Sequence, residues 1–236
     1  MHRARTFRGS GSRPILAAVT APQSIDELMA RARALAGLSL GSLSERAGLT
    51  LGHGVHAKGK PGALLEVLLG ATGGSLARHD FPDLRVELKT IPLDGKGAPL
   101  ESTYVCRVPA ADADRAEWTT SWAKEKLSLV LFVPIRARER RTPFAERIVG
   151  SAFLWSPSEE QDALLHADFD DIMGAIALGG AETLTAHVGR ILQARPKAAD
   201  GSARMRLVGP DGEAIRTVPR GFYLRPSFTA SLLTTR

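Results

Sequence analysis

Hydrophobic and polar positions repeat with two different periods along this chain, and the period separates the expected helices from the expected strands. Residues 24–27 (Ser-Ile-Asp-Glu) have the spacing of a capping box and predict a helix that ends near Gly37. We expect a short second helix over residues 42–47. A third helix covers residues 63–69, where every residue except Glu66 is apolar, and the glycines that follow end it.

Strands are predicted where the period shortens to two. Residues 85–90 alternate, with Glu87 and Lys89 on one face and Val, Leu and Thr on the other. We expect Pro92 to end this strand. An Asp-Gly turn signal then leads to residues 102–108, a second strand that we expect to form a hairpin with the first.

The second half of the chain continues with strands and one long helix. The apolar run 127–133 predicts a central strand buried on both faces, and residues 148–155 predict a further strand. Ser158 and the acids after it start a helix that reaches about Leu178. From residue 182 to the end we expect short strands and turns. The fold class is therefore α/β, with a mixed central sheet flanked by helices.

Length and composition restrict the class of protein. The 236 residues are 44% hydrophobic, which is enough for the core of one large domain or of two small lobes. Cys106 is the single cysteine, so no intrachain disulfide can form, and we expect a reduced, cytoplasmic protein. No apolar run approaches the roughly 20 residues that cross a bilayer. We therefore expect no membrane-spanning segment.

The positive charge is unevenly distributed. Residues 1–185 hold 22 basic and 22 acidic residues, whereas residues 186–236 hold 9 basic and 3 acidic ones. This asymmetry indicates a surface that faces a polyanion, although a solvated basic face is the alternative. Residues 1–21 contain arginines and no acid, and we expect them to form a disordered basic arm, with a transit peptide as the alternative.

Asp80, Glu87 and Lys89 are the strongest candidates for chemistry. Alternation places Glu87 and Lys89 about 7 Å apart on one face of a strand, and Asp80 lies in the turn before it. Two carboxylates about 4 Å apart repel by a few kcal/mol at an effective dielectric near 20, and a divalent cation removes that cost. Oxygen ligands suit Mg²⁺. Lys89 can then orient or help deprotonate a water and offset charge on a phosphate.

Glu66 provides an independent argument. Because leucines and valine surround it, we expect partial burial, and a buried carboxylate needs a cation or hydrogen-bond donors, which Lys89 or a metal could supply. Each motif alone has a simpler interpretation, namely a solvated strand face or a carboxylate that reaches water. The coincidence of this acid with a Gly-rich loop and an acid followed by Glu-x-Lys favours a site.

Seven segments, in order from about Pro22 to the end, together resemble the MutH family of DNA mismatch repair endonucleases. They are Leu-Leu-Glu-Val-Leu-Leu-Gly at 64–70, Asp-Phe at 80–81, Val-Glu-Leu-Lys-Thr-Ile-Pro at 86–92, Leu-Glu-Ser-Thr-Tyr-Val-Cys at 100–106, Leu-Trp-Ser-Pro at 154–157, Arg-Pro-Lys-Ala-Ala at 195–199 and Pro-Arg-Gly-Phe-Tyr-Leu at 219–224. The family has the type II restriction endonuclease fold. The resemblance implies two lobes around a DNA-binding cleft within residues 22–236, a catalytic lobe over about 22–135 and a DNA-readout lobe over about 136–236.

The resemblance also implies roles for single residues in catalysis. Asp80 and Glu87 would hold Mg²⁺ with assistance from Glu66. Lys89 would be the catalytic lysine, and Lys126 would be an accessory cation beside the site.

DNA contacts are implied for five further residues: Lys58 in the stretch 52–62, which predicts a mobile loop, together with Tyr104, Arg195, Lys197 and Tyr223. Arg195 and Lys197 would lie near base edges. Tyr223 would lie near the adenine that carries a methyl group in methylated sites. Tyr104 would lie near the minor groove, and it stands where the family pattern has Phe.

The family cuts the unmethylated strand 5′ to the G of hemimethylated GATC, and MutL activates it after MutS finds a mismatch. The resemblance therefore implies Mg²⁺ as cofactor, double-stranded DNA and MutL as partners, and MutS through MutL. We expect a monomeric protein of the cytoplasm that associates with the nucleoid. Two alternatives remain, a GATC-specific restriction endonuclease that makes double-strand breaks and a non-catalytic basic DNA-binding module.

Overall fold

The computed structural model describes residues 19–49, 60–74, 78–139, 141–197, 204–209 and 211–235. The helices are α1 Ile25–Leu35, α2 Leu40–Arg46, α3 Lys60–Leu69, α4 Trp122–Leu127, α5 Glu159–Ala177 and α6 Pro226–Thr234. The strands are β1 Glu87–Leu93, β2 Thr103–Arg107, β3 Val130–Arg136, β4 Ile148–Val149, β5 Phe153–Trp155, β6 Leu192–Pro196, β7 Met205–Val208, β8 Ala214–Thr217 and β9 Arg220–Leu224. Most of the predicted basic arm and the stretch containing Lys58 lie outside the described residues.

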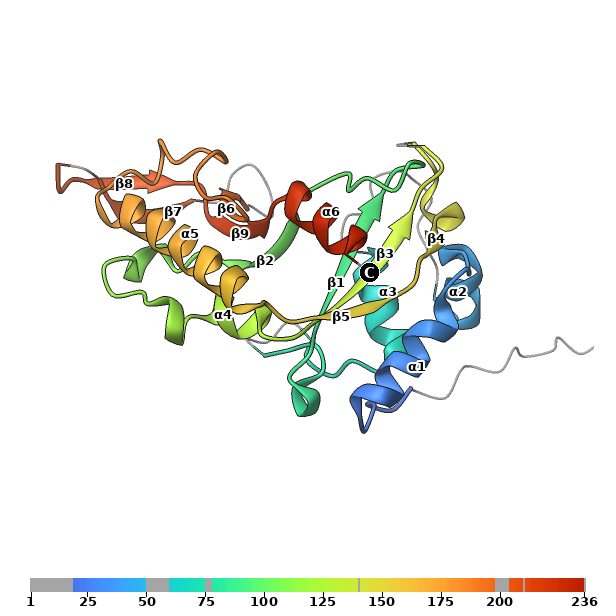
Figure 1. Cartoon of the computed structure of the whole chain (residues 1–236). Helices are drawn as coiled ribbons and strands as arrows, with labels where there is room; N and C mark the ends of the chain where they lie inside the picture. The colour runs from blue at the N-terminus through green and yellow to red at the C-terminus, as the bar shows by residue number, and fades with distance from the viewer. Residues whose placement is uncertain are drawn as a thin grey trace, which may run out of the picture.

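Two sheets organise the chain (Figure 1). In the first, β1 runs parallel to β3 with Glu87 opposite Val130, and β4 and β5 pair antiparallel with the other side of β3. The second sheet is antiparallel with the order β2-β9-β6, and β7 and β8 form a separate hairpin. Helices α1, α2 and α3 lie at one end of the molecule and the β7–β8 hairpin at the other (Figure 1). The predicted α/β class with a mixed sheet is confirmed.

Strand β3 contributes to two hydrophobic clusters. Val130 and Phe132 belong to one cluster with α5, β2 and β9, whereas Leu131 and Val133 belong to the other with α1, α2 and α3. Because successive side chains of a strand point to opposite faces, β3 is buried on both sides, as its sequence predicts. Glu87 and Ile91 are four positions apart in β1, so their side chains lie on the same face of the strand. Ile91 packs in the cluster with α5. The face of β1 that carries Glu87 is therefore directed toward the second sheet.

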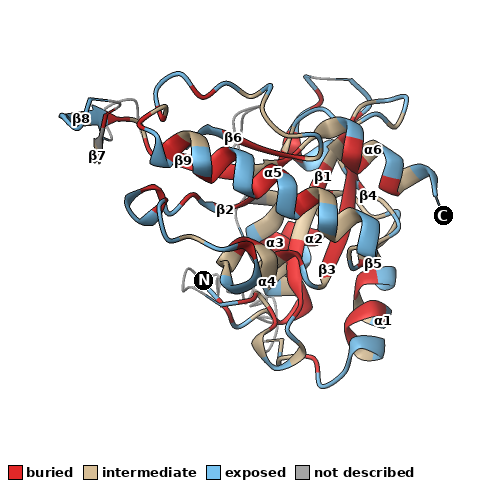
Figure 2. Ribbon diagram, turned by 60° about the vertical axis from the view of Figure 1, so that its left-hand side comes forward, coloured by how far each residue is buried: buried red, intermediate tan, exposed pale blue. Residues whose placement is uncertain are grey.

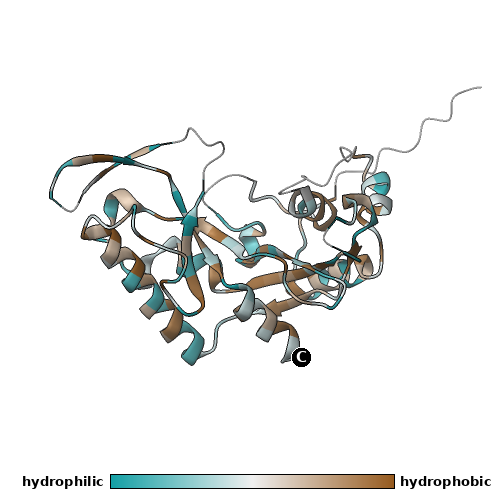
Figure 3. Ribbon diagram, turned by 90° about the horizontal axis from the view of Figure 1, so that it is seen from above, coloured by the Kyte–Doolittle hydropathy of each residue, from teal (hydrophilic) through white to brown (hydrophobic). Residues whose placement is uncertain are grey.

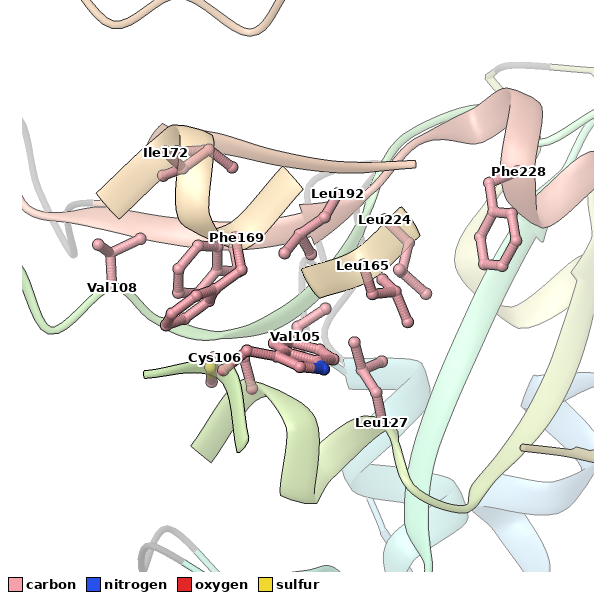
Figure 4. Packing of buried hydrophobic residues seen from close by; sticks show 14 of the residues in the cluster. Val105, Cys106, Val108, Leu127, Leu165, Phe169, Ile172, Leu192, Leu224 and Phe228 are labelled. Carbon is pink, nitrogen blue, oxygen red and sulfur yellow. The ribbon is translucent and has the colours of Figure 1, made fainter. Parts of the chain in front are cut away.

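Helix α5 covers the second sheet and begins as predicted. Ser158 and Gln161 form a reciprocal capping box at its N-terminus. Buried and exposed residues alternate along the helix, as do hydrophobic and hydrophilic ones (Figures 2 and 3). Leu165, Phe169 and Ile172 point toward side chains of β2, β9 and α4 (Figure 4). This packing fixes the second sheet against α4.

The prediction that Pro92 ends the first strand is wrong, since β1 continues to Leu93. The Pro92 carbonyl accepts a hydrogen bond from the Leu100 amide, so the missing N–H of Pro92 faces the open edge of β1 and costs no ladder bond. The central strand likewise passes through Pro134 and starts at Val130, because Leu127 completes α4.

The predicted hairpin between the first two strands is also wrong. β2 pairs with β9, and Thr103 lies opposite Leu224. The predicted strand 148–155 is divided into β4 and β5, which pair with β3 at different places. Helix α3 begins at Lys60, earlier than predicted. The C-terminal segment was expected to hold only strands and turns, but it ends in helix α6, whose Phe228 and Leu232 are buried one turn apart.

The two clusters do not separate at one point along the chain. β2 and α4 precede residue 135, and both pack in the cluster with β9 and α5. The division into a lobe of about 22–135 and a lobe of about 136–236 remains a prediction. Among the helices of the described residues, none is long and apolar enough to cross a membrane.

Candidate active site

The turn that carries Asp80 is fixed by backbone hydrogen bonds. The Asp80 carbonyl accepts from the amides of Thr72 and Gly73, each at 3.0 Å. A Cβ at Gly73 would lie 2.0 Å from the His79 carbonyl oxygen, so glycine is needed for this close approach. The Asp80 carboxylate accepts a 2.8 Å hydrogen bond from the Leu88 amide in β1. Asp80 therefore folds back beside β1, as the sequence predicts.

Glu87 lies at the centre of a group of charges. Its side chain is 1% exposed, and its Oε1 accepts hydrogen bonds from Lys89 Nζ and from Lys126 Nζ, each at 2.6 Å. Both lysine side chains are 13% exposed. A solvated strand face, the simpler interpretation of Glu-x-Lys, is therefore wrong. Lys126 lies in α4, 39 positions after Glu87 in the sequence, and the fold places its ammonium group beside the Glu87 carboxylate.

Glu66 and Asp80 complete the group. Burial and the charge of Glu87 raise the pKa of the Asp80 carboxyl, while the Leu88 amide opposes this rise. Burial and the charge of Asp80 raise the pKa of the Glu66 carboxyl, and Lys89 lowers it. These interactions place Glu66, which is half-buried in α3, within electrostatic reach of the other charged groups.

The carboxylates of this group offer oxygen ligands to a divalent cation. Glu87 Oε2 is buried and finds no hydrogen-bond partner among the described residues, although its companion oxygen has two. An orphaned carboxylate oxygen in electrostatic contact with the partly buried Asp80 carboxylate is suited to a hard cation. Within the described ranges no three Asp, Glu, His or Cys side chains gather closely enough to hold a metal by themselves. Mg²⁺ commonly uses only one or two carboxylates and completes its shell with water and phosphate, so the residues fit.

Two tyrosines connect this group to the second sheet. The Tyr104 and Tyr223 rings meet edge to face at 5.3 Å between centroids. Lys197 Nζ lies 4.4 Å from the Tyr104 ring centroid, and Lys89 Nζ lies 6.0 Å from it. A Cβ at Gly221 would lie 2.7 Å from the Tyr104 ring, so this glycine makes room for the ring. Tyr104 therefore lies between the charged group of β1 and the basic end of β6.

Arg195 is exposed on β6 and is oriented by a residue that sequence reasoning missed. Arg195 Nη1 donates a 3.0 Å hydrogen bond to Ser102 Oγ, which also accepts one from Gln193 Nε2 at 2.7 Å. No sequence signal distinguishes Ser102, because its partners lie more than 90 positions away. Cys106 is buried in the core, and burial raises the pKa of its thiol to about 12. For Lys58, which is outside the described ranges, the predicted DNA contact remains a prediction.

A mixed sheet flanked by helices, with acids and lysines gathered around one strand, is the arrangement of a restriction endonuclease-like nuclease, a class that is generally metal-dependent. The family model described as "DNA mismatch repair enzyme MutH" matches residues 69–168. The chain is also similar over nearly its whole length to proteins named "DNA mismatch repair protein MutH". It is 46% identical to that of Klebsiella pneumoniae (strain 342) over 213 residues, 90% of this chain and 92% of the relative. It is 48% identical to that of Salmonella paratyphi B over 216 residues, 91% of this chain and 93% of the relative. The chain belongs to the MutH family of DNA mismatch repair endonucleases, and it is an enzyme.

Proposed function

We propose that this chain is a Mg²⁺-dependent endonuclease that nicks the unmethylated strand 5′ to the G of hemimethylated GATC sites. MutL activates it after MutS has found a mismatch. The observation that carries the proposal is the Glu87 carboxylate, which binds two lysines through one oxygen and leaves the other free beside Asp80. Family membership supports the rest, since DNA binding follows from it.

Asp80 and Glu87 would hold the cation, with Glu66 assisting from α3. The cation supplies Lewis-acid stabilisation of charge on the scissile phosphate when it is bound. Lys89 orients the attacking water and, with Lys126, places positive charge where negative charge grows in the transition state. Because both lysines are largely buried, this charge acts in a medium of lower dielectric than water.

Arg195 and Lys197 read base edges in the proposed DNA complex, Tyr223 senses the methyl position of adenine and Tyr104 approaches the minor groove. The exposure of Arg195 and Lys197 and the contact of Lys197 with Tyr104 support this assignment. The enzyme acts as a cytoplasmic, nucleoid-associated monomer with a catalytic lobe over about 22–135 and a readout lobe over about 136–236. Its lone, buried cysteine is consistent with a reducing compartment.

The test is a gel assay on circular DNA with one GATC site in hemimethylated, fully methylated or unmethylated form, with and without Mg²⁺ and MutL. We expect Mg²⁺-dependent nicking of the unmethylated strand and no cut of fully methylated circles. Asp80→Ala should abolish cleavage and retain DNA binding, whereas Asp114→Ala, at a 67% exposed acid in an exposed ion pair, should behave as wild type. Linear product without nicked circles would instead support the restriction endonuclease, and full cleavage by Asp80→Ala would refute the site.

A second measurement separates chemistry from positioning of DNA. Lys89→Ala should lower the cleavage rate by about 100-fold or more with little change in DNA affinity, because Lys89 acts in the transition state. A loss that falls mainly on affinity would make Lys89 a phosphate contact only. Arg195→Ala should reduce the preference for GATC by about 1–3 kcal/mol.

A further inference from the structure

Helix α4 carries Lys126 but is too short to hold it in place alone. The helix has only six residues, Trp122–Leu127, and short helices depend on tertiary contacts for their stability. Ala123 and Leu127 are buried below it, and Lys124 Nζ reaches Asp162 of α5 at 3.3 Å. The direction of Lys126 toward β1 depends on contacts along the other side of the helix.

Those contacts converge on Glu125, the residue before Lys126. Arg85 Nη2 lies 2.7 and 2.9 Å from the two carboxylate oxygens of Glu125. His79 Nε2 lies 3.0 Å from the Glu125 backbone carbonyl oxygen, and because a carbonyl only accepts, this nitrogen carries the proton and donates. The His79 side chain is 6% exposed, so this contact is buried.

Each of these partners adjoins a residue of the candidate site. His79 immediately precedes Asp80, Arg85 lies two residues before Glu87, and Glu125 immediately precedes Lys126. The interactions therefore join the turn, the start of β1 and helix α4, from which Asp80, Glu87 and Lys126 enter the site.

Trp122 adds a fourth contact on the same side of α4. Its ring centroid lies 5.6 Å from that of His79, and Lys126 Nζ lies 5.3 Å from the Trp122 ring. Trp122 and Lys126 are one helical turn apart, so the ring contacts both the His79 ring, at a tilt of 57°, and the ammonium group. Movement of the helix would disturb both contacts together.

Arg85 has a backbone conformation that its residue type does not favour. Its φ is +52° and its ψ is 39°, and in the part of the chain that the structure describes it is the single non-glycine residue with positive φ. The left-handed conformation is unfavourable for a residue with a Cβ, whereas glycine adopts it freely. Arginine therefore occupies a position where the backbone conformation favours glycine. This indicates that the bonds of the guanidinium to Glu125 matter to the protein.

We propose that Glu125 is a positioning residue which, through Arg85 and His79, holds Lys126 Nζ against Glu87 Oε1. The inference rests on the proposed function, because it assumes that Lys126 assists cleavage. The Arg85 side chain is 69% exposed and Glu125 is 35% exposed, so their ion pair contributes little to global stability. Its loss should change the rate of cleavage and leave the melting temperature nearly unchanged.

The experiment compares Glu125→Gln, Arg85→Gly and the wild-type full chain in single-turnover nicking with saturating DNA and Mg²⁺. Arg85→Gly permits the same left-handed backbone conformation and removes the whole side chain, including the guanidinium. We expect each variant to cleave about tenfold more slowly, as is typical when the partner of a functional group is lost, with unchanged DNA affinity. The melting temperature should be unchanged for Glu125→Gln and unchanged or higher for Arg85→Gly, because glycine adopts the left-handed conformation without strain. The matched control is Glu27→Gln, which breaks an Arg–Glu pair of similar carboxylate exposure, 39%, in α1 and should keep the wild-type rate.

Two double variants test the route of the effect. Arg85→Gly should add nothing to Glu125→Gln if the two residues act as one unit, and Glu125→Gln should add nothing to Lys126→Ala. Wild-type rates for both single variants, losses confined to affinity or melting temperature, or full additivity with Lys126→Ala would each overturn the inference. If Lys126→Ala itself cleaves at the wild-type rate, the proposed role of Lys126 fails instead, so the two failures are distinguishable.

Discussion

Replacing Glu87 with glutamine tests the charge balance of the site. The substitution keeps the size of the side chain but removes the carboxylate that Lys89 and Lys126 both bind at 2.6 Å. The glutamine carbonyl oxygen can still accept from both ammonium groups, but it carries no compensating charge. Two lysine side chains that are each 13% exposed would then lie close together without this anion.

The magnitude follows from the burial of the three side chains. Removing one partner of a buried ion pair costs about 3–5 kcal/mol, because a charge remains buried without compensation. Both lysines retain some contact with water and Asp80 stays nearby, so we expect the lower end, about 3 kcal/mol. In a chain of this length that corresponds to a fall in melting temperature of about 6–12 °C. Lys126→Met should cost less, since Glu87 keeps its bond to Lys89.

The assay is thermal and urea unfolding of the metal-free protein at neutral pH, with Lys126→Met and wild type measured in parallel. The order of stability should be wild type, then Lys126→Met, then Glu87→Gln. A Glu87→Gln protein that melts within about 2 °C of wild type would show that the lysines do not depend on this carboxylate, and the reasoning would be refuted.

Three further predictions concern the pH dependence, the second sheet and the reading of methylation. The pKa of the Asp80 carboxyl is raised by burial and by Glu87, so the folded state binds this proton more tightly than the unfolded chain does. The metal-free protein should therefore gain stability as the pH falls from neutral through the folded-state pKa of this carboxyl. Asp80→Asn, which cannot titrate, should be more stable at neutral pH and show a smaller gain in urea melts, because Glu66, whose pKa is also raised, still titrates. Asp168 accepts 2.7 Å hydrogen bonds from the amides of Arg190, Ile191 and Leu192, so Asp168→Asn should lose about 2–5 kcal/mol of unfolding free energy in the same melts. Tyr223→Ser should fold normally and discriminate about tenfold less between methylated and unmethylated strands of a GATC site; an unchanged strand preference with a much lower melting temperature would make Tyr223 a core residue.

Local geometry allowed much of the catalytic strand to be predicted. Glu87 and Lys89 share a face because strand side chains alternate, and this depends only on neighbouring residues. Ser158 begins α5 for an equally local reason, since its side chain caps the first turn. Glu66 was expected near cations because an acid in an apolar helix needs compensation, and its raised pKa follows from that burial.

Tertiary structure decided which strands pair and which residues from distant segments enter the site. An Asp-Gly turn favours a hairpin, but β2 pairs with β9, and its buried residues pack in one cluster with α5, β9 and a face of β1. Pro92 continues a strand because its missing amide faces an open edge, which no local pattern reveals.

The sequence by itself determined the two acids and the lysine on or beside one strand, together with the apolar segments that bury them. Their spacing along the chain is short, so backbone geometry alone sets their directions. The lysine from α4 and the Arg85, His79 and Glu125 contacts that hold it come from separate segments. Their meeting depends on how two sheets and a short helix pack, because contacts between distant segments are selected by the burial of the whole core.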